Sequence, residues 1–270
     1  MLADRTASAA VSLWPAARPA ARRTLACIGF SGGGTTVFRP WASHIAADTQ
    51  LALYCYPGRD IRSGEALTHD WDALLADATG AIAGLADRPY TLFGHSLGAW
   101  VAFEVAAALE RRGLRPPARL VVSAMGTPAR YRELLRRPPT ADDCDEQLLS
   151  WLLAAGQVPE EVAAEPELVE MAMAFLRADL TAAAGYRYVS GTVTSAPITV
   201  LFGRDDPDLG QAAAAAWRPL TTSGDLRILE LPGGHFYTGE TWSALPALLA
   251  GRHPVTTRPA EGTTPCCCSE

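Results

Sequence analysis

The sequence predicts an α/β fold, with a mostly parallel central sheet flanked by helices and an inserted helical lid. Short apolar runs rich in β-branched residues alternate with helical patterns along most of the chain, which is typical of successive βαβ units. These runs are hydrophobic at nearly every position, as strands buried on both faces are. Residues 126–195 interrupt the alternation, because helical patterns follow one another there without a strand between them.

Six apolar runs are predicted to be the strands of the sheet. In chain order they are 24–30, 51–56, 90–94, 119–124, 198–203 and 226–232. Helical patterns cover 70–86, 97–112 and 240–250. A chain of 270 residues is long enough to bury one substantial core, so we expect one domain with an insertion.

The insertion at about 126–195 is predicted to be a lid rather than a second domain. Two amphipathic stretches with acidic beginnings lie within it, 140–156 and 165–186. A segment of this size leaves little core of its own. Helices inserted into a βαβ series often close over an active site.

The two ends of the chain differ in composition from the predicted domain at 24–251. Residues 1–23 are rich in Ala, Pro and Arg, and Pro15 interrupts their short apolar patch. No basic region precedes that patch, so we expect a flexible arm rather than a signal peptide. Residues 252–270 are predicted to be a disordered tail.

Cysteine usage points to the cytoplasm. Cys27 and Cys55 lie in strand-like runs and are expected to be small core residues. Cys266, Cys267 and Cys268 form a run in the tail without a histidine beside them, so we expect no metal site there. Nothing in this pattern requires an oxidising compartment.

Composition excludes several classes of function. The net charge is −6, which gives no electrostatic footprint for nucleic acid. No apolar run approaches the roughly 20 residues that span a membrane. All 23 basic residues are arginine, so Schiff-base chemistry and a phosphate-binding P-loop lysine are both excluded.

A nucleophile elbow is predicted at the end of the third apolar run. Residues 94–98 read Gly-His-Ser-Leu-Gly, which matches Gly-x-Ser-x-Gly, and a strong helical pattern follows. Such a turn strains the backbone at the serine and leaves little room for side chains at its two glycines. Ser96 is therefore the predicted nucleophile, at the carboxyl edge of the sheet and beside a helix N-terminus.

A serine hydroxyl needs a base, and the sequence contains five histidines. His235 lies in a glycine-rich loop after the last strand, as the chain order serine, acid, histidine requires. His95 adjoins the serine and is expected to pack or orient instead. His44 and His69 precede the elbow, and His253 lies near the C-terminus.

The acid of the triad is expected after the strand at 198–203. The turn that follows offers Asp205, Asp206 and Asp208. Its Gly-x-x-Asp spacing favours Asp206, with Asp205 as the alternative. The carboxylate would orient the imidazole and stabilise the imidazolium without taking the proton.

Backbone amides are expected to form the oxyanion hole. One donor is the N–H of Leu97, the residue after the nucleophile. The other is expected from the loop GFSGGGTT after the first strand, where Ser31 and Gly32 are the candidates. A phosphate-binding glycine loop is the weaker interpretation, because the spacing Gly-x-Gly-x-x-Gly is absent.

These residues together resemble the type II thioesterases, the stand-alone editing enzymes of polyketide and nonribosomal peptide synthesis in the α/β-hydrolase superfamily. The similarity covers roughly residues 24–250. The motifs that carry it are GFSGGGTTVFRPW, the YPGRDIR segment with Pro57, Gly58, Arg59 and Arg62, the elbow LFGHSLGAWVAFEVA, the Leu-Arg-Ala-Asp segment of the lid and GGHFY. Gly29 and Ser31 stand where the family usually has proline and alanine, and Leu97 where methionine is common.

The resemblance implies acyl substrates on the phosphopantetheine arm of an acyl- or peptidyl-carrier protein. Ser96 would attack the thioester carbonyl to form an acyl-enzyme, and His235 would then activate a water molecule. It calls for no metal and no cofactor. We expect a monomer whose partner is the carrier protein, with no nucleic acid and no membrane involved.

The sequence leaves the roles of two groups of residues open. Met171, Met173 and Phe175 could line an acyl channel or form ordinary lid core. Arginines after the elbow helix and at the start of the lid could meet an acidic carrier surface or form a solvated face. They are Arg111, Arg112, Arg115, Arg119, Arg130, Arg132, Arg136 and Arg137.

Three other functions fit parts of the same pattern. A small-molecule esterase or lipase would share the elbow, because the fold does not determine the substrate. A product-releasing thioesterase is normally a terminal domain of a synthase, whereas the short tails here favour a stand-alone protein. A catalytically silent carrier-binding module is disfavoured by the complete set of triad residues.

Overall fold

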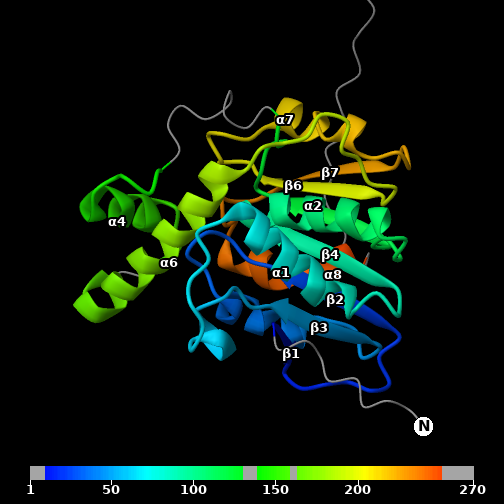
Figure 1. Cartoon of the computed structure of the whole chain (residues 1–270). Coiled ribbons are helices and arrows are strands. Elements are labelled where there is room, and N and C mark those ends of the chain that lie inside the picture. The colour runs from blue at the N-terminus through cyan, green and yellow to red at the C-terminus, as the bar shows by residue number, and fades with distance from the viewer. Residues whose placement is uncertain (1–9, 130–138, 159–162, 251–270) are drawn as a thin grey trace, which may run out of the picture.

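A single seven-stranded sheet organises the computed structural model, which describes residues 10–129, 139–158 and 163–250 (Figure 1). The spatial order is β1-β3-β2-β4-β5-β6-β7. The strands are β1 (Val11–Trp14), β2 (Arg23–Ile28), β3 (Thr49–Tyr54), β4 (Tyr90–His95), β5 (Arg119–Ser123), β6 (Ile198–Gly203) and β7 (Leu226–Leu231). All neighbours pair in parallel except β1 and β3, so the predicted mostly parallel sheet is confirmed.

The prediction of a flexible arm over residues 1–23 is wrong for its second half. Strand β1 pairs antiparallel with β3, with Val11 opposite Tyr54 and Trp14 opposite Leu51. A four-residue edge strand is too short to show an alternation of apolar residues, so the sequence gives little sign of it. Residues 1–9 and the tail predicted at 252–270, with its three cysteines, lie outside the described residues.

Helices cover both faces of the sheet. They are α1 (Trp71–Ala83), α2 (Leu97–Arg111), α4 (Asp145–Ala154), α6 (Pro166–Gly185), α7 (Gln211–Ala215) and α8 (Gly239–Leu249), with the 3₁₀ helices η1 (Thr35–Ser43), η2 (Asp60–Arg62) and η3 (Arg218–Leu220). Helices α1 and α2 bury one set of alternate strand side chains, and η1 and α8 bury the other. Both faces of the central strands are therefore apolar, which explains their continuous hydrophobic runs, whereas the edge strand β7 is only partly buried.

The insertion between β5 and β6 is helical in its described part. Helices α4 and α6 lie side by side and project to one side of the sheet (Figure 1). They share a small core of Leu148, Leu152, Met173 and Leu176. Helix α6 also reaches α1, where the rings of Tyr186 and Trp71 stack 4.1 Å apart.

No helix in the described ranges is long and apolar enough to cross a membrane.

Candidate active site

Ser96 lies at a sharp turn between β4 and α2. Its backbone has φ of +54°, a left-handed conformation that a non-glycine residue adopts only where the surroundings impose it. A Cβ on Gly94 would lie 2.0 Å from the carbonyl oxygen of Gly98, and one on Gly98 would lie 2.2 Å from that of Gly29. Both glycines are therefore required by close backbone approach, and the turn places the serine at the carboxyl end of β4.

Two neighbouring loops bring Asp206 and His235 together. Asp206 follows β6 and His235 follows β7, and His235 Nδ1 lies 3.2 Å from Asp206 Oδ2. The loops meet closely because a Cβ on Gly203 would lie 2.1 Å from the carbonyl oxygen of Gly234. Asp206 is 6% exposed, so its carboxylate faces the imidazole with little competition from water. The geometry favours Asp206 over Asp205, whose carboxylate makes no hydrogen bond to His235 among the described residues.

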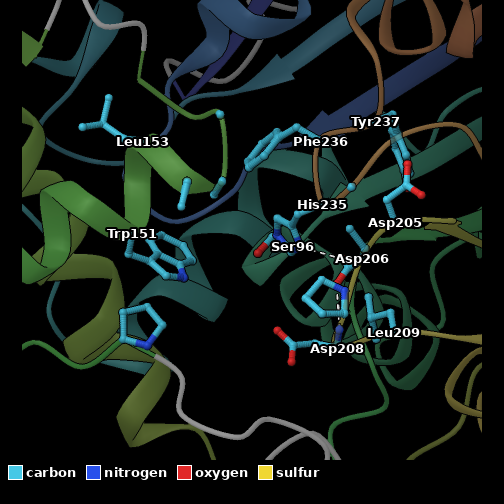
Figure 2. A pocket seen from close by; sticks show the side chains of 17 residues that line it. Ser96, Trp151, Leu153, Asp205, Asp206, Asp208, Leu209, His235, Phe236 and Tyr237 are labelled. Carbon is cyan, nitrogen blue, oxygen red and sulfur yellow. Dashed lines mark hydrogen bonds and ion pairs between the residues drawn. The ribbon is translucent and has the colours of Figure 1, made fainter.

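Ser96 and His235 line one cavity of about 580 Å³ (Figure 2). The Nε2 atom of His235 is buried and has no hydrogen-bond partner in the described part of the chain. The hydrogen bond from Ser96 to this nitrogen is therefore not formed here. Such contacts often tighten only when substrate binds.

His95 lies behind the site, away from the cavity. It is fully buried, its Nδ1 lies 2.9 Å from Ser123 Oγ, and Ser123 Oγ lies 2.7 Å from the hydroxyl of Tyr237. Burial lowers the pKa of His95 well below its usual value, and the nearby charge of His235 lowers it further. A neutral, enclosed imidazole of this kind fits the expected packing and orienting role.

The glycine loop at 29–34 gives one correction to the expected oxyanion donors. The N–H of Gly32 donates to Asp179 Oδ2 at 2.7 Å, so it is not available to an oxyanion. Ser31 is buried beside it and is the remaining candidate in the loop. Leu97 is the first residue of α2, where backbone N–H groups have no partner within the helix.

The three residues predicted to bind the acyl group do not line the cavity. Met171 is 48% exposed, and Met173 lies in the small core of the insertion. The ring of Phe175 packs 4.8 Å from the guanidinium of Arg59. Sequence periodicity showed that these residues lie on one helix, but it could not show which face of the insertion meets the cavity.

The end of α4 supplies the wall that sequence reasoning missed. Trp151, Leu153 and Gly156 line the cavity from this side, and Phe236 and Leu209 line it from the loops after β7 and β6 (Figure 2). Asp205 and Asp208 are also among the residues that line this cavity. An acyl group bound at Ser96 would therefore contact α4 rather than the methionines of α6.

In the part of the chain that the structure describes, no group of three His, Cys, Asp or Glu residues is placed to hold a metal ion.

Comparisons with known proteins agree with this geometry. A family model described as a thioesterase domain matches residues 23–255. The chain is 37% identical over 208 residues to AMB antimetabolite synthetase AmbE of Pseudomonas aeruginosa, covering 76% of this chain but only 9% of that protein. It is 31% identical over 222 residues to the human medium-chain S-acyl fatty acid synthase thioesterase, covering 81% of this chain and 82% of that one.

Solved structures show the same similarity over most of the fold. The type II thioesterase BorB from the borrelidin biosynthetic cluster is 32% identical, with a TM-score of 0.79 over 92% of this chain and 98% of that one. RedJ, a thioesterase from the prodiginine pathway of Streptomyces coelicolor, is 29% identical, with a TM-score of 0.77 over 87% of each chain.

Proposed function

Since this chain belongs to the thioesterase domain family and is a thioester hydrolase, we propose that it removes acyl groups from the phosphopantetheine arm of carrier proteins. This activity would edit or unblock polyketide or nonribosomal peptide synthases. The observation that carries the proposal is the pairing of His235 with Asp206 at the cavity where the strained Ser96 lies. The biosynthetic clusters named for BorB and RedJ support the substrate class.

The proposed reaction has two halves. Ser96 Oγ bonds to the thioester carbonyl carbon while its proton passes to His235 Nε2, and the carbon–sulfur bond then breaks. The proton goes to the departing thiol, which leaves an acyl-enzyme. His235 next takes a proton from water, whose oxygen bonds to the ester carbonyl carbon. The bond between that carbon and Ser96 Oγ then breaks, His235 returns the proton to Oγ, and the free carboxylic acid leaves. In both halves the Asp206 carboxylate stabilises the imidazolium.

A thiol leaves more readily than an alcohol, so leaving-group protonation contributes less here than the stabilisation of the oxyanion. The proposed donors are the N–H groups of Leu97 and Ser31. They would bind the tetrahedral oxygen beside the N-terminus of α2, where negative charge is favoured.

We propose the insertion as the lid of this site. The end of α4 forms one wall of the cavity, and Trp151 and Leu153 would lie against the acyl chain. A cavity of about 580 Å³ is within the usual size range of small-molecule sites. The lid boundaries at about 126–195 stay a prediction.

The arginines after α2 are poorly placed to receive the carrier protein. Helix α2 begins beside Ser96 and ends at Arg111, about 22 Å away at 1.5 Å per residue. Arg112 and Arg115 follow at that far end, and Arg119 pairs with Asp225. The other four arginines that could meet a carrier, between positions 130 and 137, lie outside the described residues.

A cytoplasmic location forms part of the proposal. Cys27, Cys55 and Cys144 are free thiols, as expected in a reducing compartment. A monomeric enzyme stays a prediction.

A panel of substrates tests the function. Wild type and Ser96→Ala are incubated with carrier proteins loaded with different acyl groups and with the matching acyl esters, and released groups are followed by intact mass. We expect the wild type to unload at least one acyl-carrier faster than any ester, and Ser96→Ala to unload none. Faster turnover of the simple esters would favour an esterase, and no turnover of any substrate would favour a silent carrier-binding module.

A further inference from the structure

The glycine loop at 29–34 is fixed by contacts from the segment after β3. The Tyr56 hydroxyl donates to the carbonyl oxygen of Gly29 at 2.9 Å. Arg59 Nη1 donates to the carbonyl oxygen of Gly33, also at 2.9 Å. Both ends of the loop are therefore bound to one neighbouring segment, and the peptide between Ser31 and Gly32 lies between the two contacts.

A side chain from the insertion makes the remaining contact. Asp179, on α6, accepts the Gly32 N–H on Oδ2 at 2.7 Å. The same carboxylate accepts Arg59 Nη1 at 2.9 Å and Arg59 Nη2 at 2.8 Å. The side chains of Arg59 and Asp179 are only 2% and 3% exposed. Asp179 thus joins three segments that are far apart in sequence: the glycine loop, the segment after β3 and the insertion.

A buried ion pair is a costly way to stabilise a fold, because both charges lose their hydration. Apolar residues of similar size often stabilise a protein equally well or better. The guanidinium is further enclosed by the rings of Tyr56 and Phe175, at 5.0 and 4.8 Å. Burial raises the pKa of Asp179, while Arg59 and the Gly32 N–H lower it. A buried pair that also binds one particular backbone amide of the glycine loop indicates a role in positioning.

We propose that Asp179 is a positioning residue: by holding the peptide between Ser31 and Gly32, it sets the direction in which the Ser31 N–H points toward the oxyanion hole. Peptide planarity means that fixing the Gly32 N–H also fixes the carbonyl group of Ser31 and restricts the direction of the N–H that precedes it. Gly32 has φ of +77°, a turn that a side chain would strain. This inference rests on the proposed function, in which the Ser31 N–H is one oxyanion donor.

The proposal couples the insertion to the chemistry. Because Asp179 belongs to α6, any movement of α6 away from the loop withdraws the acceptor from Gly32. The oxyanion loop is then in its reactive conformation only while α6 is seated against it.

Two double variants separate the effect of the Asp179 oxygen that accepts the Gly32 N–H from the effect of the buried charges. Arg59→Met with Asp179→Asn removes both charges but keeps a side-chain oxygen for Gly32. Arg59→Met with Asp179→Leu removes the charges and the oxygen, in nearly the same volume. The readout is the rate at which a fluorophosphonate probe labels Ser96, since that reaction passes through an oxyanion and needs no carrier protein. We expect the leucine form to label about tenfold more slowly than the asparagine form, below the 10²–10³-fold typical of losing a donor outright.

The control pair is Arg62→Met with Asp77→Leu. Arg62 and Asp77 also form a two-pronged ion pair, at 2.7 and 2.9 Å, but within the described ranges neither forms a hydrogen bond with the glycine loop. We expect this variant to label at the wild-type rate. Equal labelling rates in the two folded Arg59→Met variants would overturn the proposal, whereas a wild type that does not label at Ser96 would overturn the proposed function itself.

Amide hydrogen exchange of the wild type gives a second test if the leucine form does not fold. We expect the Gly32 N–H to exchange as slowly as the amides in the core of α6, because it is bound to a buried carboxylate. Fast exchange at Gly32 would overturn the proposal.

Discussion

The imidazole rings of His95 and His235 lie 5.3 Å apart, and only His235 lines the cavity. A positive charge on His95 would oppose the imidazolium that His235 must carry during catalysis. Burial removes that conflict, because it holds the pKa of His95 well below the usual value and keeps the ring neutral. The two neighbouring histidines therefore have separate tasks.

Replacing His95 is expected to cost stability without changing the ionisation seen in catalysis. His95→Phe removes the hydrogen bond to Ser123 and is predicted to lower the free energy of unfolding by about 1–3 kcal/mol. The acid limb of kcat/KM against pH should stay where it is in the wild type, because His95 does not titrate in that range. Urea unfolding and a pH–rate profile check the two parts, and a displaced acid limb would show that His95 is the titrating base.

Asp206→Asn is expected to lower kcat about 10³–10⁴-fold, because an amide does not stabilise the imidazolium and favours the wrong tautomer of His235. Single-turnover hydrolysis of a small acyl thioester measures this loss. The matched control is Asp205→Asn, one residue away and without a hydrogen bond to His235 among the described residues. A similar loss in both variants would mean that the general negative charge, rather than the Asp206 contact, supports the histidine.

The two glycines of the elbow should be intolerant of any side chain. Gly98→Ala places a Cβ 2.2 Å from the backbone oxygen of Gly29, and we expect it to destabilise the fold by about 3 kcal/mol or more. Gly80→Ala in α1 is the control, since an added Cβ there meets nothing within 4 Å. That variant should be more stable by about 0.5–1 kcal/mol, through helix propensity. Thermal unfolding compares the pair, and a Gly98→Ala protein as stable as the wild type would contradict the close approach.

The sequence was sufficient to predict a feature where its residue pattern has only one physical explanation. The buried strands could be predicted because their runs are apolar on both faces, and Ser96 because its two glycines have a steric cause. The Gly32 contact could not be predicted, because its acceptor, Asp179, lies 147 residues away in the sequence. The cavity wall at Trp151 could not be predicted either, because periodicity shows which residues share a helix face but not what that face contacts.

The wall at Trp151 leads to a prediction about acyl selectivity. Trp151→Ala removes apolar surface from the cavity and should lower kcat/KM about tenfold for acyl chains long enough to reach it, with little effect on acetyl. Met171→Ala is the control, because Met171 is exposed and does not line this cavity. Turnover of a series of acyl-carrier thioesters measures both. A larger effect at Met171 would restore the acyl channel first expected along α6.

Glu104 predicts how stability depends on pH. It is buried on α2 and accepts a hydrogen bond from the Tyr186 hydroxyl at 2.6 Å. Burial raises its pKa, although Tyr186 and Arg111 act in the opposite direction. The folded state therefore binds this proton more tightly than the unfolded state, so the contribution of Glu104 to stability falls as pH rises from its unfolded pKa through its folded pKa. Glu104→Gln keeps an oxygen that can accept from Tyr186 but carries no charge. The free energy of unfolding of this variant, relative to the wild type, should therefore increase as pH rises between the two pKa values. Urea titrations at several pH values measure it, and a gain that shrinks as pH rises would show that the carboxylate is stabilised by folding.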